Sequence, residues 1–282
     1  MIRSVLWFLV LAAGFGMMLA STRWLGGSAA TMPATAAAAV RVGPATFCVY
    51  VGGMALLLLG GSALLMRLYE ALVSRRSAWS LNSPLVVMYK YRRLLCAMHV
   101  AYFGVFVLFA AAAYAAPETQ QALLKAIGRE IRSGSGPLRV VGQAYLSRNV
   151  ALAALVTLGV NFLIGSFLSI TVPSAVLPGV GVAMAGFRAA LWGLILAPTS
   201  VGLCRVMLPH SLTLLLEGEA YILASFFAVL IPIYLFRRSE GATPAGRYAR
   251  ALVLNLRASL AVLIVLSAAA VYEAIEVIWM ME

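Results

Sequence analysis

Long, nearly uncharged apolar blocks dominate this chain, and no other feature restricts its fold so strongly. Of its 282 residues 63% are hydrophobic and 11% are charged, whereas soluble domains average about 25% charged residues. A helix of roughly 20 apolar residues crosses the ~30 Å hydrocarbon core of a bilayer. The backbone must satisfy its own hydrogen bonds there, and these blocks lack the alternation of barrel strands. The sequence therefore predicts an all-α, polytopic transmembrane helical bundle of about seven spans.

We place these spans at residues 4–20, 45–68, 94–115, 149–171, 180–196, 212–236 and 258–278. The first block could be a cleaved signal peptide or a retained signal-anchor helix. Its apolar run exceeds the usual length of about 7–15 residues in a signal peptide, which favours the retained helix. A possible cleavage site of small residues lies near Ala20 and Ser21. Cleavage there would leave six spans.

Basic residues gather between the blocks and indicate the orientation of the bundle. Cytoplasmic loops carry an excess of Lys and Arg. The loops after spans two and six carry it here, through Arg67, Arg75, Arg76, Lys90, Arg92, Arg93, Arg237, Arg238, Arg247 and Arg250. We therefore expect a multi-pass protein of the cytoplasmic (inner) membrane with its amino terminus inside and its carboxy terminus outside. The net charge of +12 then reflects contacts with the lipid bilayer, and we expect no nucleic-acid partner.

The blocks are not interrupted by a charge-rich soluble domain or an internal repeat, so we expect a single membrane domain over residues 1–282. Three N-terminal spans occupy residues 1–115, a polar-rich core occupies 149–236, and the last span occupies 258–278. Small residues along spans four and five permit close helix packing, within one chain or in a homo-oligomer.

The segment 116–148 begins with an amphipathic helix. Leu123, Leu124, Ile127 and Ile131 recur at helical spacing, with polar side chains on the other face. Two interpretations stay open: an interfacial helix lying on the bilayer, or a surface that docks a partner protein.

Two prolines bound an unusual apolar segment between spans five and six. It runs from Pro198 to Pro209 and is too short to cross a bilayer. Irregular backbone at membrane depth is tolerated only where protein buries it or where it lines a cavity. We therefore expect a re-entrant or broken helix near residues 198–211.

Polar side chains inside the spans are the candidates for function, because an ionisable group at the bilayer centre costs roughly 2.5–3.5 kcal/mol. The densest set is a candidate buried polar site of Asn161, Arg188, Arg205, His210, Glu217 and Glu219. His210 and Glu217 are about two helical turns apart and would face one side of a helix. Either the two glutamates pair with Arg188 or Arg205 and stabilise the bundle, or His210 and Glu217 line a polar cavity for an ion, a proton or a lipid headgroup.

Three other ionisable residues are interpreted as structural. Glu273 and Glu276 are near the end of the last span, where we expect a solvated rim. His99 stands alone on an apolar helix, where a histidine with satisfied hydrogen bonds in the core is expected.

Enzyme templates fit the chain poorly. It contains no Asp, and its two histidines belong to no His-Glu-x-x-His pattern. No phosphate-binding glycine loop is present, and Ser166 has no convincing base for a serine protease. We predict no catalytic residue, no bound metal and no cofactor, and an intramembrane hydrolase is the least favoured alternative.

Four short motifs lie between residues 148 and 238. They are Asn149 at a span start, Gly165 within that span, the return Val176-Leu-Pro-Gly-Val-Gly181, and Leu208-Pro-His210 ahead of Glu217 and Ala220-Tyr-Ile-Leu-Ala224. Together they resemble the stage II sporulation protein M family of bacterial and archaeal membrane proteins. Ser211 departs from the usual Gly, Glu217 lies later than the family's Glu, and Pro178-Gly179 stands where the family has Asn-Gly.

The resemblance implies an integral membrane scaffold without an established catalytic residue. In spore formers the family member works with partner proteins in peptidoglycan remodelling during engulfment. The leading prediction is therefore a scaffold that positions or recruits membrane or envelope proteins. The alternative is a small-solute, ion or lipid transporter, which the proline-bounded segment beside His210 and Glu217 favours.

Overall fold

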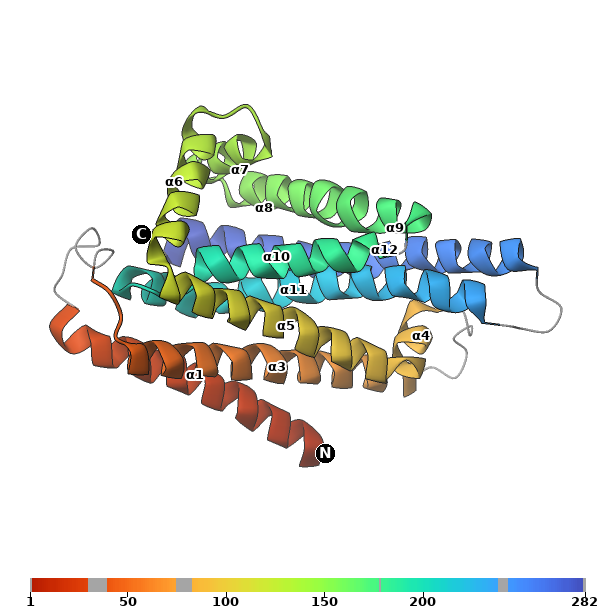
Figure 1. Ribbon diagram of the computed structural model, residues 1–282, viewed down its shortest axis with the longest axis horizontal. Coiled ribbons are helices and arrows are strands. Elements are labelled where there is room, and N and C mark those ends of the chain that lie inside the picture. The colour runs from red at the N-terminus through yellow and green to blue at the C-terminus, as the bar shows by residue number, and fades with distance from the viewer. Residues whose placement is uncertain (1, 30–39, 75–82, 178, 238–242, 281–282) are drawn as a thin grey trace.

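The computed structural model describes residues 2–29, 40–74, 83–177, 179–237 and 243–280. Nearly all of these residues are helical, and no β-strand occurs in the described ranges. The long helices run side by side along one axis and alternate in direction (Figure 1). The predicted all-α helical bundle is therefore confirmed.

Six helical segments are long and apolar enough to cross a membrane. They belong to α1 (Ile2–Ala29), α3 (Pro44–Ser74), α5 (Arg92–Ala115), the continuous run of α8 (Val150–Gly159), η1 (Val160–Thr171) and α9 (Val172–Val176), α11 (Val201–Phe236), and α12 (Pro244–Ile275) with η2 (Glu276–Met280). The expected fifth span is α10 (Val180–Leu196), an apolar helix of 17 residues. At about 1.5 Å per residue it is roughly 25 Å long, and it carries the chain back from the end of α9 to the start of α11 (Figure 1).

Short helices close the two ends of the bundle. At one end, α6 (Pro117–Ser133) runs across the bundle and is followed by α7 (Pro137–Leu146), whereas α4 (Pro84–Lys90) lies at the other (Figure 1). The amphipathic segment thus begins with a helix, as predicted, and this helix ends before Pro137. A proline in the first turn suits a helix start because its missing N–H has no partner there in any case.

Side-chain caps fix the starts of three long helices. Asn149 accepts a hydrogen bond from the Leu152 N–H over 3.1 Å at the start of α8, and Thr243 accepts one from the Gly246 N–H over 3.1 Å at the start of α12. At α11 the cap is Ser200, whose Oγ accepts from the Leu203 N–H over 3.3 Å. Each cap satisfies an N–H that the helix itself leaves open.

The expected re-entrant or broken helix near 198–211 is wrong. Only residues 197–200 are non-helical, and α11 continues from Val201 through Pro209 to Phe236. Two tyrosine hydroxyls hydrogen-bond carbonyl groups of this part of α11: Tyr50 donates to the Cys204 oxygen over 2.6 Å, and Tyr272 donates to the Pro209 oxygen over 3.0 Å. These bonds tie α11 to α3 and α12 near Pro209.

Gln120 of α6 anchors the non-helical link before α11. Its side-chain amide donates to the carbonyl oxygens of Ile195 and Ala197 over 3.0 and 2.9 Å, and it accepts a hydrogen bond from the Thr199 hydroxyl. Gln120 itself is buried. The end helix α6 is therefore fixed to the same turn that positions the start of α11.

Glycine lets α10 lie directly against α5. A Cβ on Gly193 would meet the carbonyl oxygen of Phe106 and would lie 2.9 Å from Cβ of Phe109 and 3.1 Å from the Ala110 nitrogen. We expect Gly193→Ala to lower the free energy of unfolding by about 1–3 kcal/mol, because backbone cannot yield as a side chain can. Thermal unfolding of purified protein in detergent measures the loss.

Gly186 provides the matched control on the same helix. Its Cβ would meet no atom within 4 Å, so Gly186→Ala is expected to be neutral or slightly stabilising. Equal effects of the two substitutions would contradict the close α5–α10 contact.

Candidate functional site

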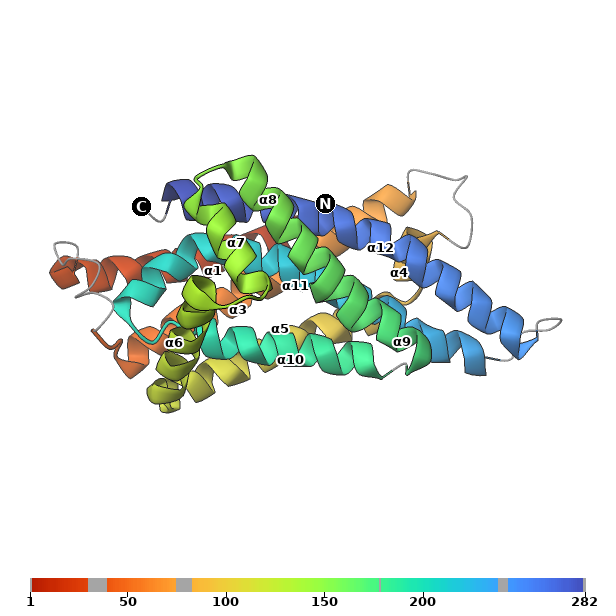
Figure 2. The ribbon, with the colours of Figure 1, turned by 90° about the horizontal axis from the view of Figure 1, so that it is seen from above.

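The candidate site is organised by α11, which lies in the middle of the bundle in both views (Figures 1 and 2). Three of its ionisable side chains belong to polar groups inside the apolar bundle, which we call the carboxyl cluster around Glu217, the His99 cluster around Glu219 and the His210 cluster. Glu217 and Glu219 are 4% and 0% exposed. Their charges or protons must therefore be satisfied by other protein groups.

The carboxyl cluster joins α11 to η1 and α12. The Asn161 amide donates a hydrogen bond to Oε1 of Glu217 over 2.5 Å. The carboxyl group of Glu273 on α12 lies close enough to Glu217 for the two groups to interact electrostatically. Two neighbouring carboxyl groups in an apolar interior cannot both be ionised without a large electrostatic cost, so we expect one of them to carry a proton. The cluster is therefore built to hold a proton inside the bundle.

Tyr145, near the end of α7, closes this cluster from outside the spans. Its hydroxyl interacts with Glu273 and lies 3.0 Å from Oγ1 of Thr157. Burial, followed by the neighbouring Glu273 charge, raises the pKa of Tyr145 above its usual value. The phenol therefore keeps its proton and acts as a neutral hydrogen-bonding group at neutral pH.

Arg188 on α10 brings a positive charge to the carboxyl cluster. Its guanidinium carbon lies 4.6 Å from the ring centroid of Tyr221, and the group interacts electrostatically with Glu217. Gly165 of η1 makes room for this arrangement, because a Cβ there would lie 3.0 Å from the Tyr221 hydroxyl and 3.1 Å from the guanidinium. Two carboxyl groups, an amide and a cation thus converge from η1, α10, α11 and α12.

Several buried polar atoms of the carboxyl cluster have no hydrogen-bond partner among the described residues. They are Nε of Arg188, Oε2 of Glu273 and the hydroxyl oxygens of Tyr102 and Tyr221. Buried polar groups are nearly always hydrogen-bonded, so each exception calls for an explanation. Their concentration beside Glu217 makes this cluster the best candidate for a functional site.

The His99 cluster joins α11 to α5 and α3. Nε2 of His99 lies 2.6 Å from Oε2 of Glu219, and Nδ1 lies 2.7 Å from the Leu95 carbonyl oxygen. The Tyr69 hydroxyl donates to Oε1 of Glu219 over 3.1 Å. His99 is therefore a buried histidine with partners at both nitrogens, as expected. The ion-pair partner of Glu219 is His99 and neither of the expected arginines.

The His210 cluster joins α11 to η2. Nδ1 of His210 lies 2.9 Å from Oε1 of Glu276, and the Thr213 hydroxyl donates to Oε2 of Glu276 over 2.7 Å. Glu276 is 0% exposed, and Oε2 of Glu273 is buried as well. The expected solvated rim is therefore wrong, because this side of α12 and η2 packs against α11.

The six residues of the predicted site are thus only partly brought together. Asn161, Arg188 and Glu217 share the carboxyl cluster, whereas Glu219 belongs to the His99 cluster. His210 and Glu217 face the same side of α11, as their spacing predicts, since their partners are close together along the chain, Glu273 near the end of α12 and Glu276 at the start of η2. Arg205 is exposed, and twelve residues of helix, about 18 Å, separate it from Glu217.

Two π-helical segments contribute residues to these clusters. Asn161 and Gly165 lie on η1, and Glu276 begins η2. π-helical turns are rare and occur often at functional sites, because the wider turn re-aims side chains. Sequence reasoning missed Glu273, Glu276 and Tyr145 as site residues. The available signal was the spacing of the two glutamates, three residues apart on one face of an apolar helix.

Comparison with protein-family models, curated proteins and solved structures gives no match for this chain. The resemblance to the stage II sporulation protein M family therefore stays a prediction. Asn149 and Gly165, two of its motif residues, have local structural roles as a helix cap and a point of close approach. Within the described residues, no group of three or more His, Cys or Glu is placed to hold a metal ion.

Proposed function

We propose that this protein is a multi-pass membrane transporter in which the Glu217–Glu273 pair exchanges a proton for a small cation. The observation that carries this proposal is a pair of buried, electrostatically interacting carboxyl groups from different helices in the interior of an apolar bundle. Ionisable side chains inside membrane helices are rare and mark ion pathways and proton relays.

The charges of the carboxyl cluster explain how exchange would work. With one proton shared between Glu217 and Glu273, the remaining negative charge is balanced by Arg188, and the cluster is neutral. Loss of the proton leaves one uncompensated negative charge in a low-dielectric interior, which is strongly unfavourable. A small cation arriving among the free oxygen atoms of Glu273, Tyr102 and Tyr221 would restore neutrality.

Proton flux across liposomes that contain the purified protein tests this proposal. With a pH-sensitive dye inside, an imposed Na⁺ or K⁺ gradient is expected to drive proton movement in the wild type. Glu217→Gln keeps the size of the side chain but cannot release a proton, so we expect at least a tenfold lower flux, on the order expected for a lost proton-transfer group.

Glu70→Gln is the control for this flux measurement. Glu70 pairs with Arg67 at 2.7 Å, and both side chains are partly exposed, away from the carboxyl cluster. This variant should transport like the wild type. The proposal would be contradicted if, with either cation, the wild type gave no more proton flux than empty liposomes. Full flux through Glu217→Gln would contradict it as well.

A scaffold that recruits membrane or envelope proteins is the second candidate function. It is favoured by an exposed cationic face on α6, where Lys125, Arg129 and Arg132 recur at helical spacing around a shallow depression. The sequence resemblance supports the same role. Reproducible capture of an acidic partner by α6, together with absent proton flux, would favour the scaffold over the transporter.

The inner membrane and an inward amino terminus remain our proposal for location and orientation. The bundle end where α4 lies, and where α11 ends and α12 begins (Figure 1), carries Arg92, Arg93, Arg247 and Arg250. The positive-inside rule supports placing this end in the cytoplasm.

A further inference from the structure

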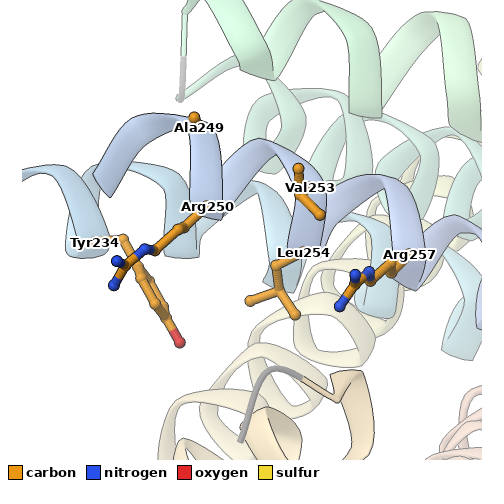
Figure 3. A pocket seen from close by; sticks show the side chains of 6 residues that line it. All are labelled: Tyr234, Ala249, Arg250, Val253, Leu254 and Arg257. Atoms are coloured by element: carbon orange, nitrogen blue, oxygen red, sulfur yellow. The ribbon is translucent and has the colours of Figure 1, made fainter. Parts of the chain in front are cut away.

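Two adjoining pockets lie along one face of the first half of α12. The first, of about 230 Å³, is lined by Tyr234, Ala249, Arg250, Val253, Leu254 and Arg257. Figure 3 shows Arg250, Leu254 and Arg257 extending from α12 toward the side where Tyr234 of α11 lies. The second pocket shares Val253 and Arg257 with the first and continues toward the middle of the membrane. The two form one groove that is cationic at one end and apolar at the other.

The cationic end offers positive charge that is free to bind an anion. Arg250 and Arg257 are exposed, and none of the residues lining either pocket is acidic. Nearby arginines are engaged differently: Arg237 donates to the Tyr91 hydroxyl over 3.0 Å, and Arg247 donates to the Leu235 carbonyl oxygen over 3.1 Å. Arg250 and Arg257 are two helical turns apart on one face, about 10 Å along the axis.

The apolar end is an exposed strip on the same helix. Leu256, Leu260 and Ile264 are 57%, 62% and 62% exposed and lie four residues apart, so they form a continuous apolar line. Pro84 and Leu85 of the α4 region form the other wall. This line begins beside Arg257 and runs about 12 Å toward the bilayer centre.

We propose that this groove binds an anionic phospholipid, with its phosphate between Arg250 and Arg257 and an acyl chain along Leu256, Leu260 and Ile264. A free phosphate would use only the cationic end, whereas the exposed apolar strip requires a hydrocarbon partner. Basic pockets between membrane helices on the cytoplasmic side are suited to anionic headgroups. The site is separate from the carboxyl cluster and does not depend on transport.

Native mass spectrometry of the full-length protein in detergent tests this site. The probes are phosphatidylglycerol and phosphatidylcholine with identical acyl chains. We expect the wild type to bind phosphatidylglycerol about thirtyfold more tightly, because two basic residues near a membrane surface contribute about 1 kcal/mol each and every 1.4 kcal/mol is about tenfold. The double variant Arg250→Gln, Arg257→Gln should lose this preference, and Leu260→Ser, Ile264→Ser should weaken binding of both lipids.

Arg129→Gln, Arg132→Gln is the matched control, because it removes the same charge from exposed positions on α6. It should keep the preference for phosphatidylglycerol. Equal losses in the two arginine variants would show general surface attraction and overturn the proposal. Displacement of phosphatidylglycerol by equimolar inorganic phosphate would overturn it as well, because the apolar strip would then contribute nothing.

Discussion

Replacing His99 with leucine is expected to lower the free energy of unfolding by about 3–5 kcal/mol. Glu219 is 0% exposed and lies 2.6 Å from Nε2 of His99. Without the imidazole, the Tyr69 hydroxyl is the one side chain among the described residues that remains bonded to this carboxyl group. A buried carboxylate that loses its ionic partner must either stay charged without compensation or take up a proton, and both are unfavourable.

The double variant His99→Leu, Glu219→Leu separates the cost of an unpaired charge from the value of the pair. Removing both members leaves no buried charge, so most of the lost stability should return. Thermal unfolding of the single and double variants in the same detergent measures the coupling energy. Val100→Ala is the control: it changes α5 at the residue next to His99, but this position is 57% exposed and lies outside the core.

A neutral effect of His99→Leu alone would contradict this expectation. Additive losses in the single and double variants would also contradict it, since additivity would mean that the two residues do not interact.

The membrane fold could be predicted because apolar length is recorded directly in the sequence. The long apolar blocks of the sequence indicate the long apolar helices, and the spacing of apolar residues after Pro117 indicates the amphipathic helix α6. That α11 continues through Pro209 was not predictable in this way. Whether a proline interrupts a membrane helix depends on how the neighbouring helices pack against it, and the contacts near Pro209, including those of Tyr50 and Tyr272, come from distant parts of the chain.

The candidate site could be predicted only in part, for a related reason. Glu217 and Glu219 stand out because they interrupt an apolar block, but the sequence does not say which helix each one faces. Their partners His99 and Glu273 lie 120 and 56 residues away along the chain. The π-helical turn that aims Asn161 at Glu217 has no recognisable sequence signal. Which side chains pair with one another across the bundle is therefore visible in the structure and not in the sequence.

Arg188→Leu is expected to abolish cation-driven proton flux and to lower the free energy of unfolding by about 3 kcal/mol, because it removes the charge that balances the carboxyl pair. Nε of Arg188 makes no hydrogen bond among the described residues. The substitution therefore removes mainly the positive charge and the contact with the Tyr221 ring. Arg41→Leu removes a similar contact, 4.9 Å from the Tyr114 ring, and Arg41 is not a member of the carboxyl cluster. This control should retain flux.

Combining Arg188→Leu with Glu217→Leu distinguishes a structural cluster from a functional one. The double variant removes one positive and one negative charge, so the remaining Glu273 can stay protonated and the bundle should regain most of its stability. Flux should nevertheless stay at the level of empty liposomes, because a single neutral carboxyl group has no partner with which to exchange its proton. Recovery of both stability and flux would mean that Glu217 and Arg188 only hold the helices together, and the transport proposal would then be wrong.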